Sequence, residues 1–217
     1  MIKNKLALII SAIILIICMI LYFPYPNNHD INASMTFMSF PLRNHDGWVP
    51  MGIFYSVLFL IALVLIVNGL KKYRIRTLFA VTIIYGLLPL SLITFYQETF
   101  ANGIMAISYD GSGNCTFESV DENVINGECN ITLLNHSNEP VSFELQLVDS
   151  VYFEDAVKME SMMNTAGPFQ ITLPPNQEEI IKLKELLDLK DDPSHITNGS
   201  VSMIHIQISD GKRTRVL

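Results

Sequence analysis

Two histidines and two methionines stand between two apolar segments of the sequence, and their side chains could bind a metal ion. The four residues are His29, Met35, Met38 and His45. Thioether sulfur suits Cu(I) and imidazole suits several transition metals, so one hypothesis is a copper-type site in residues 24–50. The spacing follows no recognised ligand pattern, and a solvated loop without metal is the interpretation that we prefer.

A pair of cysteines offers a second kind of chemistry. Cys115 and Cys129 flank a polar stretch that can turn the chain back on itself. Their separation differs from the Cys-x-x-Cys spacing of redox and metal pairs, so a structural disulfide is preferred over both alternatives. Such a bond is compatible with an oxidising compartment and, in the chain-entropy model, would stabilise the fold by roughly 3 kcal/mol. Cys18 lies in an apolar run, where we expect it to act as a small apolar side chain.

Signatures of catalysis and of nucleic-acid binding are missing from the sequence. It contains no glycine-rich phosphate loop, no HExxH and no GxSxG, and no recognisable nucleophile motif accompanies His136, His195 or His205. The net charge of −7 argues against a nucleic-acid partner, which requires a basic surface. We therefore expect neither an enzyme nor a cofactor.

Charge divides the chain into two parts that must occupy different environments. The first 96 residues hold seven Lys and Arg and two Asp and Glu, whereas the rest hold seven and nineteen. Only 16% of all residues are charged, compared with about a quarter in soluble domains. The first part is predicted to lie in the membrane lipid bilayer and the second outside it.

Three charge-free apolar runs approach the length of about 20 residues that a spanning helix needs. We predict the N-terminus and a first transmembrane helix in residues 1–23, a second helix in 51–70 and a third in 77–96. The first run could instead be a cleaved signal peptide, but the bulky, proline-broken residues after it differ from a cleavage site. No ionisable group lies inside the runs, which favours an anchor over a transporter.

The positions of the cations predict the orientation of the three helices. Six of the seven basic residues fall on one side of the membrane: Lys3, Lys5, Lys71, Lys72, Arg74 and Arg76. Loops rich in Lys and Arg stay in the cytoplasm. We therefore expect a multi-pass protein of the cell membrane with a cytoplasmic N-terminus and a cytoplasmic loop at 71–76. Residues 24–50 and the C-terminal domain are then extracellular.

The outer domain, residues 101–217, changes to the two-residue periodicity of half-buried strands. Apolar and polar residues alternate in four segments: 129–134, 141–147, 169–173 and 204–208. Asp210-Gly211 then predicts a hairpin turn into residues 212–217. Residues 151–163 and 179–189 fit either a strand or a helix. Several short strands separated by turns predict an all-β antiparallel sandwich.

One stretch of this domain carries a resemblance to a known class. Residues 129–143, CNITLLNHSNEPVSF, resemble the B–C hairpin of bacterial immunoglobulin-like accessory domains, where an Asn-rich turn ends one strand and Pro-Val opens the next. Residues 171–177, ITLPPNQ, resemble the following strand and its proline-rich turn. The resemblance covers the outer domain only. It implies an immunoglobulin-like sandwich and no catalytic residue.

These features predict a non-enzymatic integral membrane protein. Its extracytoplasmic sandwich would bind another membrane or envelope protein, as analogy with a fold used for recognition suggests. Metal handling of the copper type at the outer membrane surface, through the His and Met residues of segment 24–50, is the alternative function.

Overall fold

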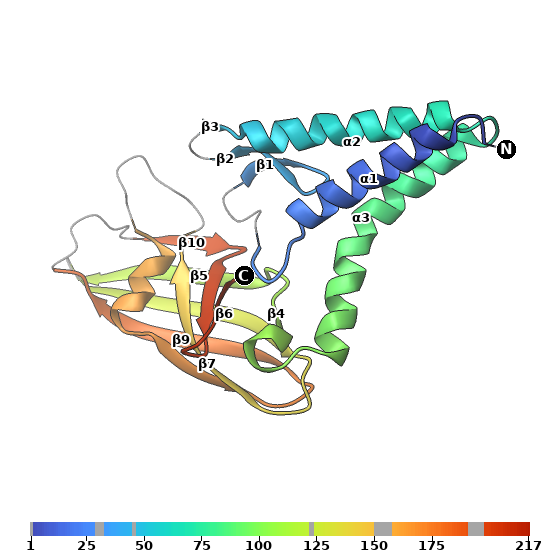
Figure 1. Cartoon of the computed structure of the whole chain (residues 1–217). Coiled ribbons are helices and arrows are strands. Elements are labelled where there is room, and N and C mark those ends of the chain that lie inside the picture. Colours follow the sequence, from blue (N-terminus) through green and yellow to red (C-terminus); the bar gives the residue numbers. More distant parts are fainter. Residues whose placement is uncertain (1, 29–32, 45–46, 122–123, 150–157, 191–197) are drawn as a thin grey trace. The chain divides into compact units, whose positions relative to one another are not determined.

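The structure is a computed structural model, and it describes residues 2–28, 33–44, 47–121, 124–149, 158–190 and 198–217 (Figure 1). The chain divides into two compact units, Met1–Thr94 and Phe95–Leu217. Helices and a small sheet build the first unit, whereas antiparallel sheets build the second. The chain therefore combines apolar helices with antiparallel β structure, which confirms the sequence prediction at this level.

Three helices dominate the first unit: α1 (Lys5–Leu21), α2 (Pro50–Gly69) and α3 (Arg74–Thr99). By length and composition, α2 and α3 could each cross a membrane, and α1 is a shorter apolar helix of 17 residues. α3 extends beyond the predicted run 77–96 at both ends. Arg, Gln and Glu are good helix formers, so the backbone continues as a helix where the apolar run stops. The predicted loop 71–76 is correspondingly shorter.

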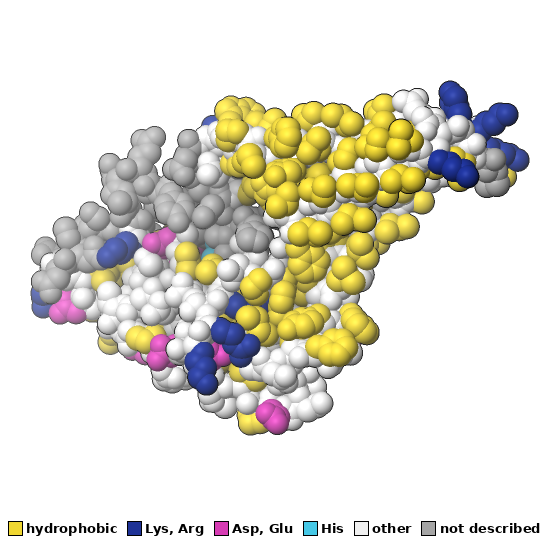
Figure 2. All heavy atoms as spheres, viewed as in Figure 1, with side chains coloured by type: hydrophobic (Ala, Val, Ile, Leu, Met, Phe, Trp, Pro, Cys, Tyr) yellow, Lys and Arg dark blue, Asp and Glu magenta, His cyan; other side chains and the backbone are white. Residues whose placement is uncertain are grey.

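α1 and α2 run antiparallel and pack closely. The hydroxyl of Ser11 donates a hydrogen bond to the carbonyl of Ala62 (2.9 Å). At the start of α1, the backbone N–H groups of Lys3 and Asn4 donate to the carbonyl of Gly69, at 2.8 and 3.0 Å. The basic N-terminal residues therefore lie at the same end of this unit as the basic turn between α2 and α3, and Figure 2 shows Lys and Arg gathered there.

The segment that was expected to be a solvated loop contains a small antiparallel sheet. Its strands are β1 (Ala33–Phe37), β2 (Phe40–Asn44) and β3 (Gly47–Trp48). The side chain of Phe40 is buried among residues from all three helices: Cys18, Phe59 and Tyr85. A Cβ atom on Gly52 would lie only 1.7 Å from the carbonyl oxygen of Pro41, so glycine permits the close approach of α2 to β2. Burial of aromatic rings thus folds this segment onto the helices.

The second unit contains short 3-10 helices and strands in the order η1 (Gly103–Ala106), β4 (Ile107–Ser108), β5 (Gly113–Asp121), β6 (Val124–Asn135), β7 (Val141–Val148), η2 (Glu160–Thr165), β8 (Phe169–Leu173), β9 (Glu178–Asp188), β10 (Gly199–Ser202), β11 (His205–Ser209) and β12 (Thr214–Val216). The first sheet runs β10–β5–β6, with β9 on the far edge of β6 and β4 at its end. The second sheet runs β12–β11–β7–β8. All pairings are antiparallel.

The four alternating segments of the sequence fall in β6, β7, β8 and β11, and the predicted hairpin joins β11 to β12. Residues 179–189, which fitted either a strand or a helix, fall almost wholly in the single strand β9. Of residues 151–163, the last four begin η2, and 151–157 lie outside the described residues. The expected B–C pair, β6 and β7, belongs to two different sheets, so residues 136–140 form a corner between sheets rather than a hairpin turn.

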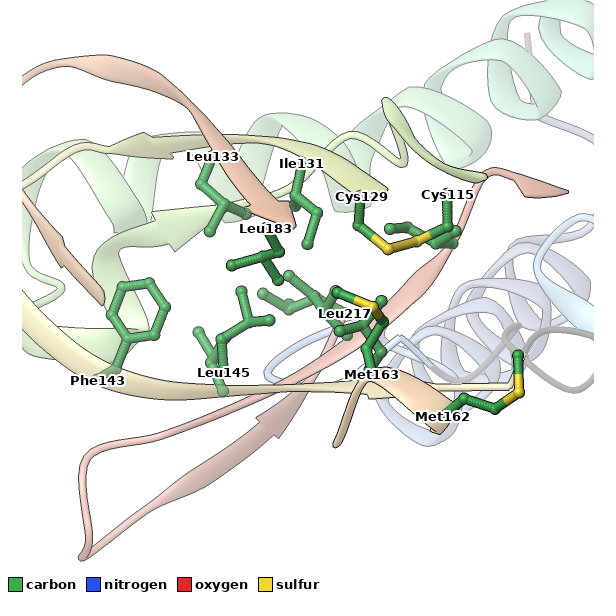
Figure 3. Packing of buried hydrophobic residues seen from close by; sticks show 14 of the residues in the cluster. Cys115, Cys129, Ile131, Leu133, Phe143, Leu145, Met162, Met163, Leu183 and Leu217 are labelled. Atoms are coloured by element: carbon green, nitrogen blue, oxygen red, sulfur yellow. A yellow bond between two sulfur atoms is a disulfide. The ribbon is translucent and has the colours of Figure 1, made fainter. Parts of the chain in front are cut away.

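The inward faces of the two sheets share one hydrophobic core. Ile131 and Leu133 of β6 point toward Phe143 and Leu145 of β7, and all four side chains are buried (Figure 3). The alternation of these strands explains the arrangement, because every second residue of a strand faces the same side.

The 3-10 helix η2 packs against the same core. Met162 and Met163 of η2 are fully buried. A Cβ atom on Gly127 of β6 would lie 2.5 Å from the sulfur of Met163, so the glycine leaves room for this flexible side chain over the strand. Thioether side chains suit such irregular spaces.

Candidate functional site

The proposed metal ligands are only partly covered by the structure. His29 and His45 lie outside the described residues. Met35 lies on β1 with its side chain exposed, whereas Met38 follows β1 and packs against the apolar cluster around Phe40. The described residues contain no group of three or more His, Cys, Asp or Glu side chains that could hold a metal ion. A copper-type site remains a prediction from the sequence alone.

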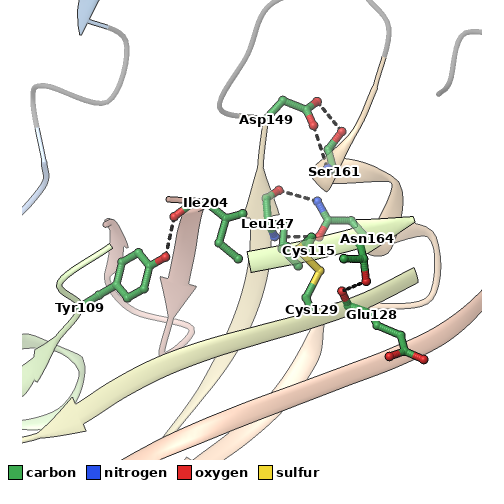
Figure 4. The surroundings of a disulfide bond; sticks show 10 residues. Tyr109, Cys115, Glu128, Cys129, Leu147, Asp149, Ser161, Asn164 and Ile204 are labelled. Atoms are coloured by element: carbon green, nitrogen blue, oxygen red, sulfur yellow. Dashed lines mark hydrogen bonds between the residues drawn. A yellow bond between two sulfur atoms is a disulfide. The ribbon is translucent and has the colours of Figure 1, made fainter. Parts of the chain in front are cut away.

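The two cysteines of the second unit form a disulfide (Figure 4). Cys115 of β5 and Cys129 of β6 are direct partners in the strand register, and both side chains are fully buried. Thiol exchange requires access to the sulfur atoms. The bond therefore acts as a structural link between neighbouring strands, the role that its sequence spacing favoured.

A polar cavity of about 310 Å³ lies inside the second unit, between the last turn of α3 and the β6–β7 corner. Its lining includes the side chains of Glu98, Asn102, His136 and Glu139. The ring Nε2 of His136 lies 2.9 Å from the hydroxyl of Ser108, a pairing that hydrolases use to activate a nucleophile. Ser108 does not line the cavity, however, so the pair presents no nucleophile to a ligand there.

Hydrogen bonds of His136 and of the neighbouring Asn135 hold the β6–β7 corner beside this cavity in place. The backbone N–H of His136 donates to the carbonyl of Ala106, so ring and backbone together hold the segment around β4. The buried amide of Asn135 donates to the carbonyls of Glu139 and Pro174, at 2.9 and 3.0 Å. This bonding accounts for the asparagine-rich corner without a catalytic role.

Two buried polar side chains hold the segment that follows α3. Gln97 donates through Nε2 to the carbonyls of Met105 and Ile107, at 3.3 and 2.9 Å. Arg215, only 3% exposed, donates through Nη1 to the carbonyls of Ile104 and Ile107, at 2.6 and 2.8 Å. Neither residue was predicted from the sequence, because a single polar residue at the end of an apolar run or in a terminal strand belongs to no recognisable pattern.

The long strand β9 has an exposed face and an exposed edge to which a partner could bind. It spans eleven residues and pairs with β6 along one side, and none of the described strands pairs with its other side. On its outward face Ile180 and Leu186 are 61% and 67% exposed. Lys182 and Lys184 lie between them, and Lys184 forms an ion pair with Glu128 of β6. The hydrogen bond from Lys184 holds the pKa of Glu128 below its usual value.

The register shows which backbone groups of β9 face away from the sheet. Thr132 of β6 pairs with Ile180, and its N–H donates to the carbonyl of Ser112 on the side of β5. In an antiparallel pair, opposite residues either exchange hydrogen bonds or both point away from each other. The N–H and C=O of Ile180 therefore point away from β6, as do those of Lys182, Lys184 and Leu186. Such an edge can accept an added strand.

The described surfaces offer a structural disulfide, a polar cavity beside the His136–Ser108 hydrogen bond, and an open strand edge. No protein family, no curated protein and no solved structure matches this chain.

Proposed function

We propose that the chain is a multi-pass protein of the cell membrane that displays an immunoglobulin-like sandwich outside the cell. The sandwich binds an extended segment of another membrane or envelope protein, which adds as a strand to β9. The observation that carries the proposal is the open edge of β9, where every second residue from Ile180 to Leu186 presents its backbone N–H and C=O.

The first unit supports the membrane topology. α2 and α3 have the length and composition of spanning helices. α1 packs beside α2, and a 17-residue helix is about 26 Å long, somewhat shorter than the ~30 Å hydrocarbon core. A helix this short spans with modest local thinning of the bilayer. The basic residues before α1 and after α2 lie together at one end of this helix pair, which favours a cytoplasmic N-terminus.

The order of the strands supports an immunoglobulin-like sandwich. In such domains strands A, B and E pair in one sheet and strands C, F and G pair in the other. Here β5, β6 and β9 pair in one sheet, and β7, β11 and β12 pair in the other. The corner at residues 136–140 carries the chain between sheets, as the B–C connection does in that fold.

The side chains of β9 favour a specific partner over indiscriminate pairing. Lysines on an edge strand discourage association with unrelated strands. Lys182 and Lys184 occupy the middle of β9, and the exposed apolar side chains of Ile180 and Leu186 flank them. A matching segment of the partner would place apolar side chains near Ile180 and Leu186. It would also place an acidic side chain near Lys182. No observation in the described residues favours metal handling as a second function.

A proline substitution tests the proposed strand addition. Lys182→Pro removes an N–H that faces the open edge and leaves the hydrogen bonds to β6 in place. Lys182→Ala removes the same side chain but keeps the N–H, so it is the matched control. In cells that produce the full chain, crosslinking and affinity capture should recover the partner with wild type and Lys182→Ala, and not with Lys182→Pro. Recovery of the same partner by all three would refute binding at this edge.

Accessibility of introduced cysteines tests the topology independently. A thiol reagent that cannot cross membranes should label Ser200→Cys in intact cells and should not label Tyr73→Cys. The native cysteines give little background, because Cys115 and Cys129 are bonded and Cys18 is buried. The reverse labelling pattern would overturn the proposed orientation and, with it, an extracellular binding role.

A further inference from the structure

An apolar groove of about 350 Å³ lies between α1 and α3 within the first unit. Its walls are formed mainly by Leu15, Ile16 and Met19 of α1 and by Val81, Ile84 and Leu88 of α3. We propose that this groove binds an acyl chain of an anionic phospholipid, whose phosphate lies near Lys5 and Arg74. The proposal rests on the membrane insertion proposed above.

Helical spacing aligns one cation with each wall of the groove. Lys5 precedes the lining residue Ala12 by seven positions on α1, and Arg74 precedes the lining residue Val81 by seven positions on α3. Residues seven apart lie on the same face of a helix, about 10 Å apart along its axis. Both cations are exposed. The Nε of Arg74 donates to the carbonyl of Leu70 (2.7 Å), which holds this side chain at the start of α3.

The depth of the groove matches one leaflet of a bilayer. From Arg74 to Leu88 the helix rises about 21 Å. Half of the hydrocarbon core is about 15 Å thick, and the headgroup region adds about 6 Å. A lipid whose phosphate lies at the level of Arg74 therefore carries its acyl chain along Val81 and Ile84 to the level of Leu88.

Charge selects an anionic headgroup over a zwitterionic one. The described part of the first unit has no Asp or Glu, and the basic residues before α1 and between α2 and α3 lie at one end of it (Figure 2). Basic sites between membrane helices on the cytoplasmic side attract anionic headgroups. The apolar groove adds what a cluster of cations lacks, which is a defined place for the acyl chain.

Lipid competition followed by native mass spectrometry tests the proposal on the full chain in mild detergent. The probes are phosphatidylglycerol and phosphatidylcholine with identical acyl chains, supplied in equal amounts. Wild type should retain phosphatidylglycerol preferentially. The Lys5→Gln/Arg74→Gln variant should lose that preference by roughly thirtyfold, on the scale expected for two cations near anionic lipid.

Two further variants separate the groove from general electrostatic attraction. Lys71→Gln/Lys72→Gln removes the same charge from the same end but leaves both aligned cations, and should keep most of the preference. Val81→Phe keeps every charge but fills the groove, and should reduce retention of the lipid. Equal losses in both charge variants, or full retention by Val81→Phe, would overturn the site. A lipid-free dimer that Val81→Phe disrupts would assign the groove to a second copy of the chain instead.

An insertion assay keeps the two proposals distinct. Wild type and all variants should remain in the membrane pellet after alkaline extraction. Extraction of the wild-type chain would contradict the membrane topology itself. Retention in the pellet without any preference between the two lipids would contradict the lipid site alone.

Discussion

The two units use apolar side chains in opposite ways. In the first unit large apolar residues point outward along all three helices, and Leu60 of α2, for example, is 50% exposed (Figure 2). In the second unit the apolar residues of β6 and β7 are buried between two sheets (Figure 3). Exposure of apolar side chains is ordinary for a helix in lipid, whereas on a folded β domain a contiguous exposed apolar patch marks a binding surface.

The largest effect should come from the core of the second unit. Leu145→Ala removes a fully buried side chain of β7 and should lower the free energy of unfolding by about 2–5 kcal/mol, through lost burial and a residual cavity. The matched change Leu186→Ala, on the exposed face of β9, should alter it by less than about 0.5 kcal/mol. Hydrogen exchange of the second unit measures both. Similar losses would mean that Leu186 is buried in the native protein.

An arginine should distinguish exposure to lipid from exposure to water. Leu60→Arg places a charge near the middle of α2 and should cost about 2.5–3.5 kcal/mol of insertion free energy. If α2 then fails to insert, the second unit changes sides, and labelling of a Ser200→Cys reporter in intact cells should fall. Ile180→Arg, at a similarly exposed position of β9, should leave both labelling and stability nearly unchanged. Equal labelling of the two variants would argue against a lipid-facing α2.

The disulfide should stabilise one unit only. Cys115→Ala/Cys129→Ala opens a link across a sequence separation of 14 residues and should destabilise the second unit by about 3 kcal/mol. Cys18→Ala, in the first unit, should leave the unfolding of the second unchanged. Thermal unfolding with and without reductant measures the contribution of the disulfide. Reduction of wild type should lower its stability to that of the double cysteine variant. No effect of reductant would mean that the bond does not form in the native protein.

The features that could be predicted from the sequence are those that show in the local spacing of apolar residues. The charge-free runs correspond to α1, α2 and α3, and strict alternation identified β7 and β8. β9 fitted two interpretations, because the neighbouring apolar pairs Ile180-Ile181 and Leu186-Leu187 suit a helix as well as a strand. In the structure one member of each pair faces the core and the other faces outward.

The features that sequence missed depend on contacts between distant residues. Phe40 belongs to a polar-flanked segment, and only the folded helices provide the apolar surface that buries it. Arg215 donates a hydrogen bond to the carbonyl of Ile107, which precedes it by 108 residues in the sequence. No local sequence pattern predicts such a bond. The open edge of β9 likewise follows from pairing between strands, and pairing partners are not encoded in the periodicity of either strand.

The smallest expected effect is a pH dependence confined to the second unit. Half-burial on β11 lowers the pKa of His205 below its usual value. The unfolded chain, with a histidine pKa near 6.5, therefore binds a proton more readily than the folded one. The stability that neutral His205 contributes is present above about pH 6.5 and is lost as the pH falls below it. Screening at a half-exposed position limits the effect to a fraction of a kcal/mol.

This window is separate from that of the carboxylates. Hydrogen bonds from Ser112 hold the pKa of Asp110 below its usual value, so its contribution is lost only below about pH 4. His205→Gln should remove the decline between pH 6.5 and 5 and leave the decline below pH 4. Unfolding of the second unit, measured by hydrogen exchange over this range, checks both. A decline that persists unchanged in His205→Gln would assign the proton uptake to another group of this unit and leave His205 with a packing role on β11.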